Sequence, residues 1–106
     1  MNQTGLLHMV YFYPTENGGA EEAERLIAGI RRNLPKIPGV LRLEVGTPAG
    51  TAREVVDNSY AVGMLIEFPD ADAQEAYQDH PDHHRFVEEC HALWSRVVVF
   101  DSLVRR

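Results

Sequence analysis

The first apolar segment of the chain, residues 6–13, has no polar face in any strand that it could form. Its aromatic and β-branched residues predict a strand, which Pro14 ends. Alternate side chains of a strand point to opposite faces. One face would carry His8, Val10 and Phe12, and the other would carry Leu7, Met9, Tyr11 and Tyr13. A layer of helices covers only one face of a sheet, so this strand requires a second cover.

Further segments follow in a definite order. Residues 20–34 repeat apolar positions at helical spacing, and residues 40–45 alternate apolar and charged, as in an edge strand. A nearly all-apolar strand over residues 60–68 precedes a helical region capped by Asp70, and a last strand covers residues 97–103. This order predicts an α+β fold of ferredoxin-like βαββαβ topology, with an antiparallel sheet whose first and third strands are central. The length of 106 residues fits a single domain.

The second helical region contains a break. The residue before a proline resists helical geometry, and proline suits the first turn of a helix, so His80-Pro81 ends one helix and begins another. Beyond the break, an apolar stripe at helical spacing consists of Phe86, Val87, Cys90, Leu93 and Trp94. We expect Cys90 to be a buried structural thiol and Trp94 to pack in the core.

The third strand and the last strand are also apolar on both faces. The simplest cover for the face without helices is a second copy of the same sheet, which predicts a homodimer. Such a dimer should bury more than about 1,200 Å², with Leu7, Met9 and Tyr11 at or beside the interface. The alternative is that the aromatic residues line a solvated surface.

The net charge and the cysteine content limit which partners and which cell compartment fit this chain. The formal net charge of −6 argues against nucleic acid and anionic membranes, which bind to basic patches. A single cysteine excludes a disulfide within the chain and fits a reducing compartment. No apolar run is long enough to span a membrane, and no signal-peptide pattern stands at the N-terminus. We therefore expect a cytoplasmic protein.

Several stretches of the sequence, in this order, resemble the Dabb family, the stress-responsive dimeric α/β-barrel proteins. They are HMVYFYP, IPGVLRLEVG, the long run SYAVGMLIEFPDADAQEAYQDHPDHHRFVEE and LWSRVVVFDS. The most specific piece is Tyr-x-x-His-Pro-x-His-x-x-Phe, which begins at Tyr77 and ends at Phe86. The resemblance covers residues 7–102 and implies a dimer whose two sheets face each other as a barrel.

The resemblance does not imply one activity. One branch resembles polyketide cyclases, which close a poly-β-keto chain by intramolecular aldol condensation without a metal or organic cofactor. Carried over residue by residue, that branch assigns the catalytic pair to Tyr77 and His83, with His8 as a further match. This chain has Val62 where the branch has a histidine. Two alternatives stay open: a non-enzymatic stress or structural dimer, and a haem- or quinone-handling monooxygenase-like protein of the same topology.

The residue types of this trio fit an aldol step. Such a step needs a base near neutral pH and a hydrogen-bond donor for the oxygen that gains charge, roles that histidine and a buried tyrosine can fill. We expect Tyr77 and His83, from the two sides of the helix break, and His8, from a central strand, to converge on a mostly apolar cavity that binds a small apolar molecule. The alternative is scaffolding, in which Tyr77 packs in the core with a satisfied hydroxyl, His83 caps a helix turn and His8 hydrogen-bonds to it.

Three other features bear on function. His80 and His84 stand four residues apart, a spacing of metal ligands on a helix, but the proline breaks the helix between them. We therefore expect neither a metal nor a coloured cofactor. The connection over residues 46–58 contains Arg53 and either closes over a pocket or is a solvated loop. Gly63, in a central strand, either makes room for a ligand or marks a bulge.

Overall fold

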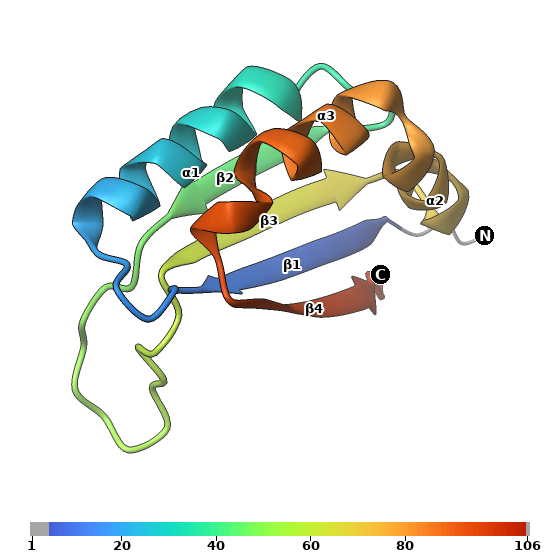
Figure 1. Cartoon of the computed structure of the whole chain (residues 1–106). Helices are drawn as coiled ribbons and strands as arrows, with labels where there is room; N and C mark the ends of the chain where they lie inside the picture. Colours follow the sequence, from blue (N-terminus) through green and yellow to red (C-terminus); the bar gives the residue numbers. More distant parts are fainter. Residues whose placement is uncertain (1–4, 106) are drawn as a thin grey trace.

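The computed structural model describes residues 5–105, and its elements follow the predicted order. They are β1 (Leu6–Tyr13), α1 (Ala20–Asn33), β2 (Arg42–Gly46), β3 (Val62–Phe68), α2 (Ala71–Asp79), α3 (Pro81–Cys90), a 3-10 turn (His91–Leu93) and β4 (Arg96–Leu103). Figure 1 shows the three α-helices on one face of the sheet. The predicted ferredoxin-like α+β fold is confirmed. Within residues 5–105, no helix has the length and apolar character needed to cross a membrane.

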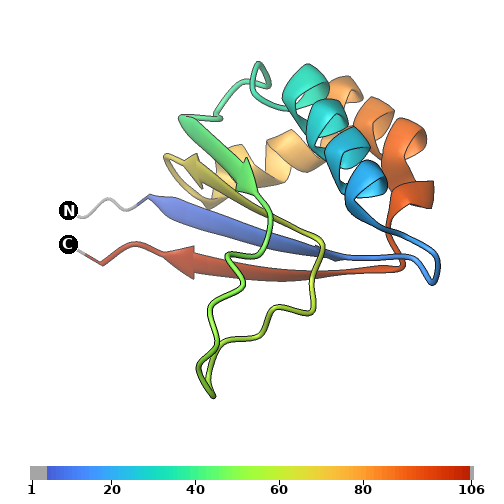
Figure 2. The same ribbon diagram turned by 90° about the vertical axis from the view of Figure 1, so that its left-hand side faces the viewer.

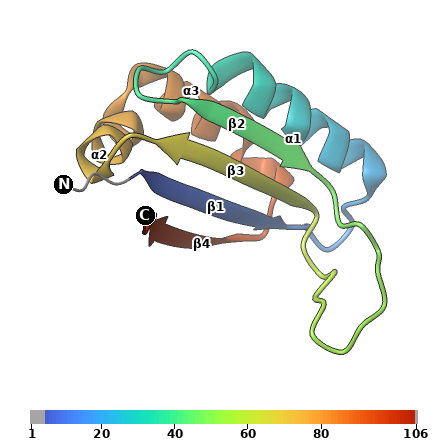
Figure 3. The same cartoon turned by 180° about the vertical axis from the view of Figure 1, so that it is seen from behind.

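The sheet has the strand order β2-β3-β1-β4, and every neighbouring pair is antiparallel. β1 and β3 are therefore central, as predicted, and β2 lies at an edge. Figures 2 and 3 show the helices above one face of the sheet and no helix on the opposite face. Because β1 lies between β3 and β4, His8 faces Ile66 on one side and Asp101 on the other.

The two central strands bury every second side chain against the helices. On β1 these are Leu6, His8, Val10 and Phe12, and on β3 they are Val62, Met64, Ile66 and Phe68. The predicted orientation of β1 is thus confirmed. A fully buried aliphatic or aromatic side chain contributes roughly 1.5–3 kcal/mol, so a register shift by one residue would expose this whole set.

The outer face of the sheet, on the side without helices, is apolar at its centre and carries Glu67 and Arg96 towards its ends. Its side chains include Leu7, Met9, Tyr11, Tyr13, Leu65, Val98 and Phe100. The β1 members are half-buried by their neighbours, whereas Phe100 is 58% exposed. This chain alone therefore leaves the outer face without a cover.

Gly63 gives space to two tyrosines on the outer face. The rings of Tyr11 and Tyr60 meet at a centroid distance of 5.0 Å, and a Cβ on Gly63 would lie 3.2 Å from the Tyr60 ring. Gly63 pairs directly with Tyr11 in the regular β1–β3 register. The bulge, one of the two predicted alternatives, is therefore wrong, and the rings of Tyr11 and Tyr60 pack next to Gly63.

Residues 47–61 form a long loop between β2 and β3. Figures 1 and 2 show it leaving the sheet on the side opposite to the helices. Internal hydrogen bonds hold its shape, including Asn58 Nδ2 to the Thr51 carbonyl at 2.9 Å and the Val56 amide to the Arg53 carbonyl at 2.9 Å. Arg53 is exposed. The loop is solvated and does not close over the helical side of the sheet.

The last helix is shorter than the apolar stripe predicted. α3 ends at Cys90, and Leu93 and Trp94 belong to the 3-10 turn and the link to β4. The Ser95 amide already donates to the Tyr13 carbonyl at 2.9 Å, so the chain must reach the sheet within a few residues. That tertiary constraint overrides the helical periodicity.

A close contact joins α1 to α3. Gly29 faces Cys90, and Asn33, one turn later, donates from Nδ2 to the Gly29 carbonyl and to Glu89 Oε1, each at 3.0 Å. Arg32 also reaches the Glu89 carboxylate at 3.0 Å. Cys90 is 2% exposed, which confirms the predicted buried thiol, and burial raises the pKa of its Sγ–H. The two helices approach this closely because position 29 has no side chain.

Substituting Gly29 by alanine should destabilise the protein through this contact. The new Cβ would stand 2.3 Å from Cys90 Sγ, closer than any real contact, so one helix must shift or the thiol must leave its rotamer. We expect a loss of about 2 kcal/mol, a fall in Tm of roughly 10 °C for a domain of this size. Denaturant and thermal unfolding monitored by circular dichroism measure it.

The double variant Gly29→Ala/Cys90→Ala is the matched control. Removal of the sulfur leaves Arg32 Nη2 at 3.7 Å and the Cβ of residue 90 at 4.0 Å as the nearest atoms to the new methyl, which are ordinary contacts. Alanine also favours the helix over glycine by about 1 kcal/mol. The double variant should therefore recover most of the lost stability. Additive losses in the two single variants and the double variant would contradict a direct clash.

Candidate functional site

A pocket between the sheet and the two later helices contains the predicted trio. Its volume is about 390 Å³. Its apolar wall comprises Val10, Phe12, Met64, Phe86, Val87, Trp94, Val97 and Val99. Its polar members are His8, Gln74, Tyr77, Gln78, His83 and Asp101. A mostly apolar cavity with a few converging polar groups is typical of a small-molecule site.

Tyr77 lies between the two histidines. Its ring centroid is 4.8 Å from that of His83 and 5.8 Å from that of His8, and both contacts are edge-to-face. Tyr77 is 1% exposed and also packs against Phe68 at 5.0 Å. The structure thus brings together the three residues that the sequence singled out.

Local sequence signals position the two helical members. Asp70 caps α2 by accepting from the Ala73 amide at 2.8 Å, as predicted, and places Tyr77 on the buried face. His80 caps α3, because its Nδ1 accepts from the Asp82 amide at 3.0 Å, and Pro81 occupies the first turn. The cap is therefore His80 and not His83, which corrects the scaffolding alternative. His83 lies in the first turn of α3 with its side chain free to line the pocket.

Asp101 is a member of the site that sequence reasoning missed. Its Oδ1 lies 2.6 Å from His8 Nδ1, across the β1–β4 pair. An ionised carboxylate has no proton, so Nδ1 donates and Nε2 is the nitrogen left for other partners. The available signal was a single acid directly after the apolar run over residues 97–100, but only the register of β4 against β1 shows which residue it meets.

Burial separates the acid and base roles of the trio. Burial raises the pKa of Tyr77 far above its ordinary value, so its hydroxyl stays protonated and acts as a donor. Burial, together with the nearby His84 and His8, lowers the pKa of His83, so its imidazole is neutral at pH 7 and can accept a proton. Within residues 5–105, every fully buried side-chain N or O has a hydrogen-bond partner. Burial alone raises the pKa of Tyr77, and no hydrogen bond to its hydroxyl contributes, so this oxygen is not one of the fully buried atoms. The hydroxyl therefore opens onto the pocket.

Trp94 forms part of the pocket wall. Its ring lies 4.9 Å from Phe12 and 5.7 Å from Phe86 by centroid distance. The predicted packing against the core is confirmed, but Trp94 is only half-buried and also faces the cavity. An aromatic cluster thus occupies one part of the pocket wall, and the ionisable groups occupy another.

The other histidines do not extend the trio into a metal site. His84 is exposed, and His80 is used as a helix cap. In the part of the chain that the structure describes, no three His, Cys, Asp or Glu side chains are grouped closely enough to hold a metal ion. Arg53, on the long loop, does not line the pocket of the trio.

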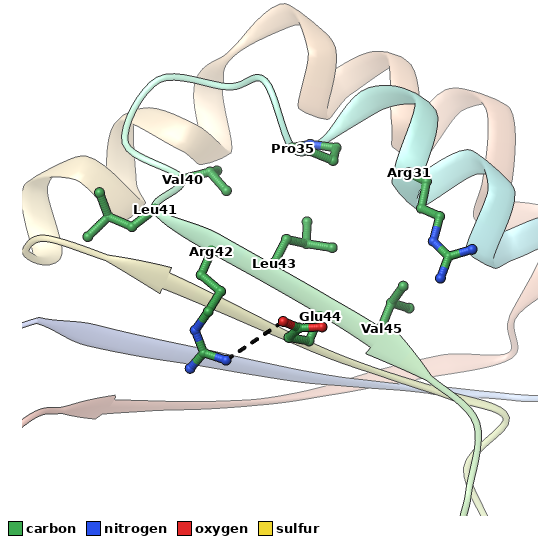
Figure 4. A pocket seen from close by; sticks show the side chains of 8 residues that line it. All are labelled: Arg31, Pro35, Val40, Leu41, Arg42, Leu43, Glu44 and Val45. Carbon is green, nitrogen blue, oxygen red and sulfur yellow. Dashed lines mark ion pairs between the residues drawn. The ribbon is translucent and has the colours of Figure 1, made fainter.

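A second groove lies between α1 and the edge strand β2 (Figure 4). Its volume is about 300 Å³, and its ionisable lining residues are Arg31, Arg42 and Glu44. Arg42 and Glu44 form an ion pair at 3.9 Å, drawn as the dashed line in Figure 4. The lining of this groove contains no histidine, cysteine or tyrosine. The pocket of the trio is therefore the candidate site.

The low pKa of His83 should make stability depend on pH. A histidine whose folded pKa lies below its ordinary value of 6.5 binds its proton more readily in the unfolded chain, so protonation favours unfolding. Its contribution is complete above the ordinary value and is lost as the pH falls towards the folded pKa. His83→Gln should flatten the fall in unfolding free energy between about pH 7 and pH 5. His91→Gln, at an exposed position, is the control, and an unchanged slope in His83→Gln would contradict this.

The sequence matches one known protein family. Residues 6–104 match the profile of the family described as Stress responsive A/B Barrel Domain, or Dabb. No curated protein sequence gives a significant match.

Solved structures share the fold over nearly the whole chain. A Dabb family protein with a ferredoxin-like fold from Mesorhizobium loti is 26% identical, with a TM-score of 0.77 over 98% of this chain and 100% of that one. A dimeric ferredoxin-like protein of unknown function from a Jannaschia species is 26% identical, with a TM-score of 0.75 over 94% and 99%. The hydroxynitrile lyase from Passiflora edulis is 16% identical, with a TM-score of 0.78 over 95% and 94%, and shares the fold.

Proposed function

The chain belongs to the Dabb family of stress-responsive A/B barrel domains, and we propose that it is a homodimer that binds a small apolar molecule and catalyses cofactor-free acid–base chemistry on it. One observation carries the proposal: a neutral His83 and a protonated Tyr77 lie side by side in a mostly apolar pocket. An aldol ring closure of the polyketide-cyclase type is the reaction that this pair fits best.

His83 is the base of the proposed reaction. Its neutral imidazole takes a proton from the carbon next to a ketone, so a C–H bond breaks and an enolate forms. The enolate carbon attacks a second carbonyl of the same molecule, which forms the C–C bond and leaves an alkoxide. The imidazolium returns its proton to that oxygen, and His83 is ready again.

Tyr77 stabilises the oxygen that gains charge, and His8 packs against Tyr77. The Tyr77 hydroxyl, held protonated by burial, donates a hydrogen bond to the enolate oxygen. Asp101 fixes the His8 ring by accepting from Nδ1 at 2.6 Å, and so sets its orientation against Tyr77. Asp101 is therefore a positioning residue in this proposal.

A second copy of the chain is the proposed cover of the outer face. The centre of that face is apolar across β1, β3 and β4, with Glu67 and Arg96 towards its ends, and Phe100 is 58% exposed in the single chain. Exposed apolar surface of this kind favours association with another apolar surface. A solved structure that is 26% identical is described as dimeric, which supports a closed two-sheet barrel here.

The hydroxynitrile lyase supports only the general idea that this fold carries catalysis. At 16% identity it shares the fold, and nothing about its substrate is transferred to this chain. A non-enzymatic dimer remains the competing function, and an assay separates the two.

The test is the cyclisation of heptane-2,4,6-trione. Bond formation between its first and sixth carbons, with loss of one water, gives 3,5-dihydroxytoluene, which liquid chromatography separates from the linear ketone. The purified protein, stripped of metal by a chelator, should accelerate this conversion over buffer. A rate equal to that in buffer, with the protein folded and the pocket able to bind a ketone, would refute the catalytic proposal.

A further inference from the structure

The charged side chains that line the trio's pocket include a carboxylate and no permanent cation. Its described lining residues include no lysine or arginine, and Asp101 is its only carboxylate. We infer that the pocket selects uncharged ligands and that Asp101 is the residue that excludes anions. This inference rests on the proposed function, because it names the class of molecule that the proposed site accepts.

The arginines of the neighbouring elements are directed elsewhere. Arg85, on α3, is held by Asp82 in an ion pair at 2.5 Å. Arg96, at the start of β4, lies over the ring of Tyr13 at 4.0 Å, and Tyr13 belongs to the outer face. No fixed cation from these elements is therefore aimed at the pocket to balance a bound carboxylate or phosphate.

The histidines do not supply the missing positive charge. His8 is bonded to Asp101, so the pair has a net charge of zero or −1, whichever protonation state His8 adopts. His83 is neutral at pH 7 because burial lowers its pKa. A ligand carboxylate would lose water and meet a carboxylate of the same sign, which weakens its binding.

The remaining polar groups of the pocket suit an uncharged partner. Gln74 and Gln78 stand four residues apart on α2, so they share one side of that helix, and both line the pocket. Gln78 is exposed, and Gln74 is half-buried. Side-chain amides both donate and accept hydrogen bonds, so they can hold a carbonyl or hydroxyl without requiring a charge.

Two probes of nearly equal shape test the inference. 2-Nonanone and octanoate share a seven-carbon chain on a carbonyl carbon. At that carbon 2-nonanone carries a methyl group, whereas octanoate carries a charged oxygen. Trp94 is the single tryptophan of the chain and lines the pocket, so its fluorescence reports binding of either probe, with titration calorimetry as a second measurement. At about pH 8, where octanoate is fully ionised, the ketone should bind at least about tenfold more tightly.

Substitutions then locate the source of the selectivity. Asp101→Asn keeps an oxygen that can accept from His8 and should reduce the preference for the ketone to about threefold or less. Gln78→Lys, at an exposed position of the lining, should tighten octanoate binding relative to 2-nonanone binding. Asp72→Asn, on α2 but outside the lining, is the control and should keep the full preference.

Each result has a distinct meaning. Equal affinity of the unmodified protein for both probes would overturn the selectivity. An unchanged preference in a folded Asp101→Asn variant, together with no gain for octanoate in Gln78→Lys, would overturn the role of charge. Failure of both probes to bind would refute the proposed ligand site and this inference with it. Ketone-selective binding without turnover of the triketone would support the inference while refuting the catalytic proposal.

Discussion

Replacing His83 by alanine is expected to slow the cyclisation of heptane-2,4,6-trione by about 10²–10⁴. Without the imidazole, the histidine ring nearest to Tyr77 is lost, since the His83 centroid lies 4.8 Å from the Tyr77 ring and that of His8 lies 5.8 Å away. The variant should stay folded, because His83 is only half-buried and its backbone contacts within α3 do not depend on the side chain. Steady-state kinetics and circular dichroism measure the two effects.

The chemical role of His83 can be separated from a structural one. Added imidazole should restore part of the rate to His83→Ala, because the truncation leaves space that opens onto the pocket. Tyr77→Phe should lower the rate by about 10²–10³. When it is combined with His83→Ala, added imidazole should raise the rate by the same factor as in His83→Ala alone. In the unmodified protein kcat/KM should fall as the pH drops below 6.5, as the lowered pKa of His83 requires.

The exposed neighbour His84 provides the matched control. His84→Ala should retain nearly the full rate, because its side chain does not line the pocket. Full activity of His83→Ala would place the base elsewhere. Equal losses in the two variants would indicate a general effect on the helix.

A charge in the middle of the outer face should separate the proposed dimer. Met9 lies at the centre of β1 on that face, opposite Leu65 on β3 and Phe100 on β4. Met9→Asp would bury an unpaired carboxylate in each of two symmetric copies, at several kcal/mol per charge. We expect the dissociation constant to rise by more than about 10³, so that light scattering detects a monomer at micromolar concentration.

Leu41→Asp is the control for the dimer. Leu41 is 62% exposed and lines the groove between α1 and β2, away from the outer face. This variant should remain dimeric. A folded Met9→Asp variant that stays dimeric would show that the partner covers a different surface, and a monomeric unmodified protein would refute the dimer itself.

The sequence was sufficient for the fold because local signals and side-chain periodicity agree. Apolar residues on both faces marked β1 and β3 as central strands, and the Asp70 cap and the His80-Pro81 break fixed where α2 and α3 begin. Tyr77 and His83 could be predicted from the sequence for the same reason, since both lie within a short, recognisable run.

The parts that were missed depend on contacts between distant segments. Asp101 and His8 are 93 positions apart, and only the β4–β1 register brings them to 2.6 Å. The early end of α3 is set by the Ser95–Tyr13 bond, which no local pattern encodes. The space over Gly63 is filled by Tyr60, from the end of the long loop, which periodicity within a strand does not reveal.

The first and last strands lie side by side, with the Val104 amide donating to the Gly5 carbonyl at 2.8 Å. His8, on β1, therefore has no Asp101 partner until the final strand is synthesised, so a nascent chain forms the His8–Asp101 pair only when β4 emerges. A circular permutant that joins residues 104 and 5 through a short linker and opens in the loop over residues 47–61 would turn β4 and β1 into a local hairpin. That permutant would have a lower contact order around the site, and it should fold faster than the natural connectivity while building the same pocket.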